Sequence, residues 1–146
     1  IGSGLVGSEM CIRDSAGAEG GCQEEVGSAS AMAAAALVCA NGGSAEQAAT
    51  VVAITLQNML GLVCDPVAGL VEVPCVKRNA LGASQAMISA DMALAGCISV
   101  IPADEVIEAV NRVGMQLPAT LRETGEGGLA TTPTGLRLKE QIFGKK

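Results

Sequence analysis

Six cysteines in a chain of 146 residues are the side chains best suited to chemistry in this sequence. Cys64 and Cys75 bracket a loop, and Pro66 and Pro74 stiffen it near each thiol. Thiolates bind metals or react as nucleophiles, thiols can pair into disulfides, and small buried thiols also simply fill space. There is no histidine, so the commonest metal ligand and the commonest general base are both missing. A metal site in this chain would therefore rest on Cys, Asp or Glu.

Two long helices joined by a tight turn are expected before this loop. The first covers residues 24–40 and stops at an Asn-Gly-Gly sequence. Ser44 and Gln47 have the spacing of a capping box, so a second helix begins there and runs to about residue 60. Because the link is short, the two helices should lie side by side and run antiparallel.

This hairpin predicts that three thiols meet at one end. Cys22 precedes the first helix, Cys64 follows the second, and Cys75 closes the loop. A helix N-terminus carries partial positive charge, which stabilises a thiolate. Three thiolates suit an iron–sulfur cluster with one open iron, whereas structural zinc usually takes four protein ligands. From the residues alone, an iron–sulfur site, a zinc site, a disulfide and plain packing all stay open.

The rest of the chain also shows helical patterns and no alternating strand of useful length, so the predicted fold class is all-α. Cys39 and Cys97 fall away from the predicted meeting point and are interpreted as packing residues. Residues 1–15 show no periodicity, form an unassigned and possibly foreign segment, and contain Cys11, which is set aside. Further helices are expected over residues 78–95, 102–114 and 136–143, with a loop that contains at most a short helix over 117–135.

Charge and hydropathy exclude several classes of protein. The net charge is −6 with only nine Lys and Arg, which argues against a nucleic-acid surface. Residues 26–45 and 47–64 lack charge, but both contain too many polar residues for a convincing membrane span. No signal peptide is visible in the sequence, so a cytoplasmic protein is expected.

Three blocks of the sequence strongly resemble the iron–sulfur-dependent bacterial L-serine dehydratase (L-serine ammonia-lyase), specifically its alpha chain. The similarity covers about residues 16–146 and leaves residues 1–15 outside it. The amino-terminal half of the family's catalytic domain has no counterpart here, so the chain is interpreted as a carboxy-terminal fragment. The blocks are AGAEGGCQEEVGSASAMAAAAL, NMLGLVCDPVAGLVEVPCVKRNALGA and LRETGEGGLATTPTG.

The resemblance implies an all-helical catalytic domain with an oxygen-sensitive [4Fe-4S] cluster bound by Cys22, Cys64 and Cys75. The implied reaction, a step of amino-acid degradation and gluconeogenesis, converts L-serine to pyruvate and ammonia. An open iron would act as a Lewis acid on the substrate hydroxyl, and the base that removes the α-proton is not identified. A beta chain with a regulatory domain would be the partner, and a preference for L-serine over L-threonine is left open.

Two cations lie two and three residues after the third cysteine of this set. Lys77 and Arg78 could bind the substrate carboxylate or offset the charge of a cluster, and a solvated helix start is the alternative. Asp65 lies within the cysteine loop and precedes a proline, so a turn role is favoured, and a hydrogen bond near the cluster is the alternative.

Three other functions are retained beside the lyase: a non-catalytic zinc or redox module, an inactive fragment of the lyase, and a pyridoxal-phosphate dehydratase. The last needs a Schiff-base lysine in a pocket, and three of the four lysines lie near the C-terminal end.

Overall fold

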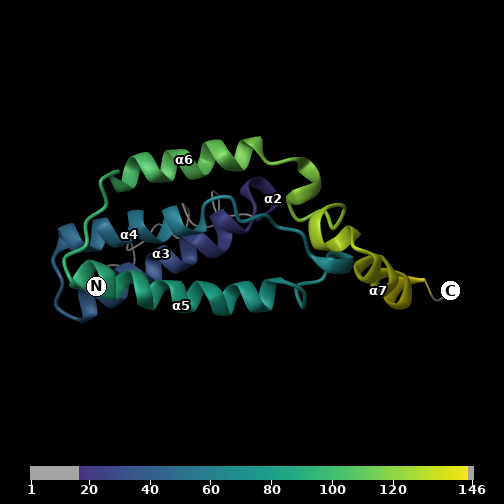
Figure 1. Ribbon diagram of the computed structural model, residues 1–146, viewed down its shortest axis with the longest axis horizontal. Helices are drawn as coiled ribbons and strands as arrows, with labels where there is room; N and C mark the ends of the chain where they lie inside the picture. The colour runs from purple at the N-terminus through teal and green to yellow at the C-terminus, as the bar shows by residue number, and fades with distance from the viewer. Residues whose placement is uncertain (1–16, 145–146) are drawn as a thin grey trace, which may run out of the picture.

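A computed structural model describes residues 17–144, which are helical apart from connecting loops and one isolated β-bridge (Figure 1). The predicted all-α fold is confirmed for this range. Residues 1–15, including Cys11, lie outside the described residues. The elements in order are α2 (Gly17–Gly20), α3 (Cys22–Ala40), α4 (Ala45–Met59), η1 (Val67–Gly69), α5 (Cys75–Leu94), α6 (Ala103–Gln116), η2 (Ala119–Leu121), η3 (Gly128–Thr131) and α7 (Pro133–Phe143).

The predicted hairpin of two long helices is present as α3 and α4 (Figure 1). At the start of α4, the Gln47 backbone N–H donates to Ser44 Oγ at 3.1 Å. The Ser44 N–H in turn donates to Gln47 Oε1 at 2.9 Å, so the predicted capping box is confirmed. Gly42 makes the turn between the helices with a φ of +78°, a conformation that favours glycine.

Helix α5 packs against both helices of the hairpin, and α6 packs mainly against α4. The contact of α5 with α3 is close because Gly82 has no side chain. A Cβ there would lie 2.6 Å from Ser30 Oγ and 2.7 Å from Val26 Cγ1. Small residues likewise fill the core between these three helices, at Ala34, Val38, Val51, Ala86, Ala90 and Ala93.

Several helix ends differ from the prediction. Helix α5 begins at Cys75, not at residue 78, because the Pro74 carbonyl accepts the Lys77 and Arg78 N–H groups, each at 3.0 Å, and closes the first turn earlier. Cys22 is likewise the first residue of α3 and does not precede it. At the other end of the chain, Pro102 is the N-cap of α6 and not its first helical residue. Two of the three thiols therefore sit in the first turn of a helix.

The C-terminal part of the described chain extends beyond the four long helices (Figure 1). Helix α7 packs on η1, which belongs to the loop between Cys64 and Cys75, and on η3. The 117–135 segment, predicted as a loop, contains two short 3-10 turns and the start of α7. Among residues 17–144, no helix combines the length and apolar character needed to cross a bilayer.

Candidate metal centre

The three predicted thiols converge at one end of the α3–α4 hairpin. Cys22 begins α3, Cys75 begins α5, and Cys64 lies in the loop after α4. Cys22 is 1% exposed and Cys64 is 2% exposed, and both belong to one apolar cluster with Val26 and Met59. Cys75 is partly exposed. Cys22 and Cys75 each lie at the N-terminus of a helix, where the backbone carries a partial positive charge.

Cys22 and Cys64 belong to one buried cluster, and a hydrogen bond links their thiols. The hydrogen bond from Cys64 lowers the pKa of Cys22 to about 7, against the opposing effect of burial, and Arg78 lowers it further. The same hydrogen bond and burial raise the pKa of Cys64, which therefore keeps its proton. Burial also raises the pKa of Cys75, and the charge on Cys22 adds to this effect. Cys22 is the thiol that the fold prepares as a thiolate.

Arg78 and Asp65 form a largely buried ion pair beside these thiols. Arg78 Nη1 lies 2.7 Å from Asp65 Oδ1, and the two side chains are 15% and 4% exposed. Burial lowers the pKa of Arg78, but the hydrogen bond and charge of Asp65 outweigh this and raise it overall. Asp65 therefore has a larger role than the turn residue expected from the sequence. Lys77 is exposed, so its substrate-binding role stays a prediction without a buried partner.

The glycine-rich segment after α6, residues 117–132, is hydrogen-bonded to the loop that carries Cys64. The Cys64 N–H donates to the Leu121 carbonyl at 2.8 Å, and the Glu123 N–H donates to the Cys64 carbonyl at 2.8 Å, forming the isolated bridge between Cys64 and Arg122. Within residues 17–144, Arg122 Nε is the one buried side-chain nitrogen or oxygen atom without a hydrogen-bond partner. The sequence predicted a loop here, and the backbone pairing with Cys64 makes this loop part of the site.

Gln23 is a site residue that sequence reasoning missed. It follows Cys22 directly and is 0% exposed. Its Nε2 donates to the Val110 carbonyl in α6 at 2.9 Å, and its Oε1 accepts the Gly61 N–H at 2.9 Å. A buried amide with both ends satisfied fixes the start of α3 against α6 and against the loop that carries Cys64.

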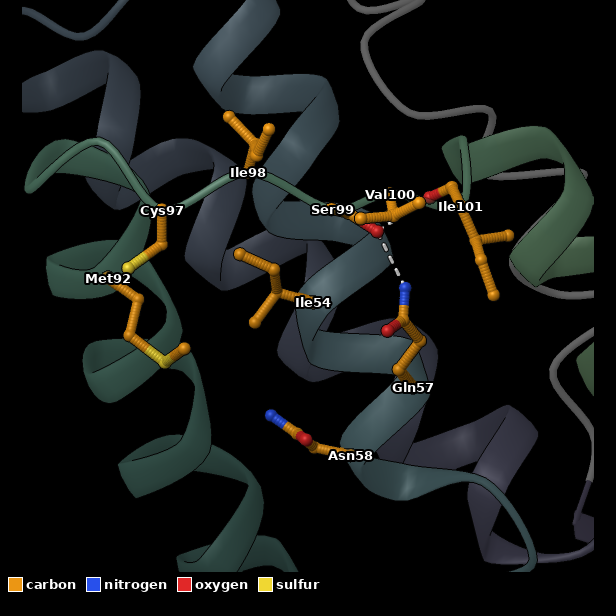
Figure 2. Close-up of a pocket in the computed structure, with 9 residues that line it drawn as sticks. All are labelled: Ile54, Gln57, Asn58, Met92, Cys97, Ile98, Ser99, Val100 and Ile101. Carbon is orange, nitrogen blue, oxygen red and sulfur yellow. Dashed lines mark hydrogen bonds between the residues drawn. The ribbon is translucent and has the colours of Figure 1, made fainter.

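Cys39 and Cys97 are not core residues. Both are exposed, so the interpretation of these thiols as packing residues is wrong. Cys39 lies near the end of α3, where only one side of the helix is covered, and Cys97 lies in the link between α5 and α6. Cys97 is part of a shallow pocket of about 350 Å³ that contains none of the three converging thiols (Figure 2). The residues that line this pocket are Ile54, Gln57, Asn58, Met92, Cys97, Ile98, Ser99, Val100 and Ile101.

The three cysteines are ligands of the type that soft metals and iron–sulfur clusters prefer. Thiolates are the usual ligands of such clusters, and Cys22, Cys64 and Cys75 provide three. Within the described part of the chain, no three His, Cys, Asp or Glu side chains are arranged as a ready-made metal site. The side chains of these cysteines would therefore have to reorient when a metal group binds.

An all-α domain with three cysteines gathered at the end of a helical hairpin is the class that this fold and site define. The family model of the serine dehydratase alpha chain matches residues 9–130, and the chain belongs to this family. The chain is 70% identical over 128 residues to the probable L-serine dehydratase, alpha chain, of Bacillus subtilis, covering 88% of this chain and 43% of that protein.

Two further relatives carry similar names. A probable L-serine dehydratase, alpha chain, of Latilactobacillus sakei is 67% identical over 89% of this chain and 62% of its own length. The L-serine dehydratase, alpha chain, of Peptoniphilus asaccharolyticus is 60% identical over 88% of this chain and 44% of its own length. The chain thus spans between 43% and 62% of these three relatives.

Proposed function

We propose that this chain is the cluster-binding part of an L-serine ammonia-lyase, which converts L-serine to pyruvate and ammonia. The observation that carries the proposal is the contact between two buried thiols, Cys22 and Cys64, with Cys75 close enough to contribute to the raised pKa of Cys64. The names of the relatives support the substrate and the reaction. Because the chain spans only part of those proteins, activity is proposed for the complete alpha chain with its beta chain.

Cys22, Cys64 and Cys75 are the residues that would hold a [4Fe-4S] cluster. When bound, the cluster supplies an iron with a free coordination position, which acts as a Lewis acid toward the substrate hydroxyl. The chain itself contributes the buried apolar wall of Val26 and Met59, which limits access of water to the thiols. The N-terminus of α3 and the hydrogen bond from Cys64 favour the anionic form of Cys22. A cluster of this kind also suits the reducing cytoplasm, where we place the protein.

Substrate binding by Lys77 and Arg78 remains part of the proposal. Lys77 is exposed at the first turn of α5 and can reach a substrate carboxylate from solvent. Arg78 Nη1 already donates to the protein, so only the rest of its guanidinium group is available to a carboxylate. These two cations therefore have different expected effects: loss of Lys77 should raise KM, whereas loss of Arg78 should also disturb the cluster site.

The alternatives lack comparable support from the described residues. A pyridoxal-phosphate enzyme needs a lysine in a cofactor pocket, but Lys77 and Lys139, the two lysines within residues 17–144, are both exposed. A zinc or redox module without catalysis would use the same thiols, so it is an outcome of the test below. An inactive fragment of the lyase would bind a cluster without turning over serine.

The test is anaerobic reconstitution of the chain with iron and sulfide, followed by counting of both per chain. We expect iron and acid-labile sulfide in equal amounts, with a visible absorbance that disappears in air. Replacement of Cys22, Cys64 or Cys75 by Ser should abolish this uptake. Cys39→Ser and Cys97→Ser are the matched controls, because both thiols are exposed and lie outside the centre.

Two results would overturn the cluster assignment. The first is a stable protein that binds one zinc and no sulfide. The second is equal loss of iron in all five cysteine variants, which would show that uptake does not depend on this centre. Pyruvate formation from L-serine, measured with the reconstituted chain alone and with the complete alpha and beta chains, then separates an inactive fragment from an active part.

A further inference from the structure

We propose that Arg78 and Asp65 form a positioning pair that holds a positive charge beside the Cys22 sulfur, where it would serve the cluster, and that links this position to the segment at Gly128 and Leu129. This inference rests on the proposed function, because the cluster is the group that the pair would serve. It adds a task to Arg78 beyond substrate binding, and it gives Asp65 a role in the site.

A single nitrogen atom of Arg78, Nη1, makes three contacts. It lies 2.7 Å from the Val63 carbonyl, 2.7 Å from Asp65 Oδ1 and 3.8 Å from Cys22 Sγ. A guanidinium nitrogen of this type has two hydrogens, so the two short contacts with oxygen determine where the group lies. The longer contact gives Cys22 a nearby positive charge without a strong hydrogen bond. The sulfur lone pairs therefore remain available to iron.

Asp65 connects this guanidinium to the glycine-rich segment. Its Oδ2 accepts the Leu129 N–H at 2.8 Å, while Oδ1 accepts from Arg78. The carboxylate fits because Gly128 has no side chain: a Cβ at Gly128 would lie 2.8 Å from the Asp65 Cβ and would overlap Oδ2. With 4% of its side chain exposed, Asp65 has little room to move away. The 128–131 turn therefore supports Asp65, which supports Arg78, which faces Cys22.

The charges favour this arrangement for an anionic group. Three thiolates and a cluster bring negative charge into a partly buried place, and a fixed cation nearby offsets it. Asp65 keeps Arg78 from turning toward solvent, while leaving the pair close to neutral before the cluster binds. Partners of metal ligands that hold them in place typically change metal affinity by about 10–100-fold when removed.

The experiment uses the whole chain and compares Arg78→Met, Arg78→Lys, Asp65→Asn and Gly128→Ala. After anaerobic reconstitution, the rate of iron loss to a chelator and the reduction potential of the cluster are measured. We expect Arg78→Met and Asp65→Asn to speed iron loss by about 10-fold or more. Arg78→Met should also lower the potential, and Arg78→Lys should restore most of it, because the effect depends on charge.

Gly128→Ala tests the link from the glycine-rich segment. Gly42→Ala is its matched control, because both glycines have positive φ, but nothing lies within 4 Å of a Cβ at Gly42. We expect faster iron loss in Gly128→Ala and an unchanged rate in Gly42→Ala. Far-UV circular dichroism checks folding, and if Arg78→Met does not fold, the conservative variants Arg78→Lys and Asp65→Asn decide.

The outcomes separate this inference from the proposed function. If the wild-type chain takes up no iron and sulfide, the proposed function is wrong, and the role proposed for Arg78 and Asp65 is wrong as well. If the wild-type chain binds a cluster but the folded variants lose iron at the wild-type rate with an unchanged potential, the inference is wrong and the proposed function stands. If Arg78→Met loses iron faster than the wild-type chain, while Arg78→Lys and Asp65→Asn both lose it at the wild-type rate, the role of Asp65 is contradicted.

Discussion

The replacement of Gln23 by Leu tests how the start of α3 is fixed. Leucine has a similar size, so the change removes both side-chain hydrogen bonds of Gln23 without a large cavity. The Val110 carbonyl then loses the Gln23 donor, and the Gly61 N–H, on an exposed residue, can turn to water. Each of the two lost bonds costs about 1 kcal/mol net, so we expect a total of about 2 kcal/mol.

The assay is urea unfolding followed by far-UV circular dichroism, because the chain has no Trp or Tyr to give a fluorescence signal. Small proteins have urea slopes of about 1–3 kcal/mol/M, so the midpoint should fall by roughly 1–2 M. Gln116→Leu is the matched control at an exposed position and should change the free energy of unfolding by less than about 0.5 kcal/mol. Equal midpoints for Gln23→Leu and the wild-type chain would refute the structural role assigned to this amide.

Three further predictions concern the helices and the outer thiols. Gly82→Ala should lower the free energy of unfolding by about 1–3 kcal/mol, because the added methyl group would push α5 away from α3. Ser84→Ala, on the exposed side of α5, is the control and should change this free energy little. Equal urea midpoints for the two variants would contradict the close packing at Gly82. Ser44→Ala removes the cap of α4 and should cost about 1 kcal/mol in the same measurement. Cys39 and Cys97 should react with a maleimide in the folded chain well before the buried thiols of the centre, as judged by mass spectrometry of digested samples, and simultaneous labelling would contradict the burial described above.

The α3–α4 hairpin could be predicted because its signals are local. The Asn-Gly-Gly turn and the pairing of Ser44 with Gln47 are contained within a few residues, and the structure has both. The meeting of Cys22 with Cys64 followed from this hairpin, since antiparallel helices of similar length return the chain to where it started. The place of Cys75 followed from the loop that it closes, and the family blocks added the expected chemistry.

The remaining features depend on contacts between distant parts of the chain. Gln23 reads as an ordinary helix residue, and only the folded structure brings Gly61 and Val110 to its two ends. Asp65 reads as a turn residue because its partners, Arg78 and the Leu129 N–H, belong to other elements. No local pattern reports such contacts, so burial and pairing of single polar residues escaped prediction.

The backbone pairing of Cys64 has a consequence for the order of biosynthesis. Both sides of this residue are tied by hydrogen bonds to Leu121 and Glu123, which leave the ribosome long after the thiol itself. When all three cysteines have left the ribosome, the backbone partners of Cys64 have not yet been synthesised. The backbone pairing that holds Cys64 in place can therefore form only after residues 121–123 have been synthesised.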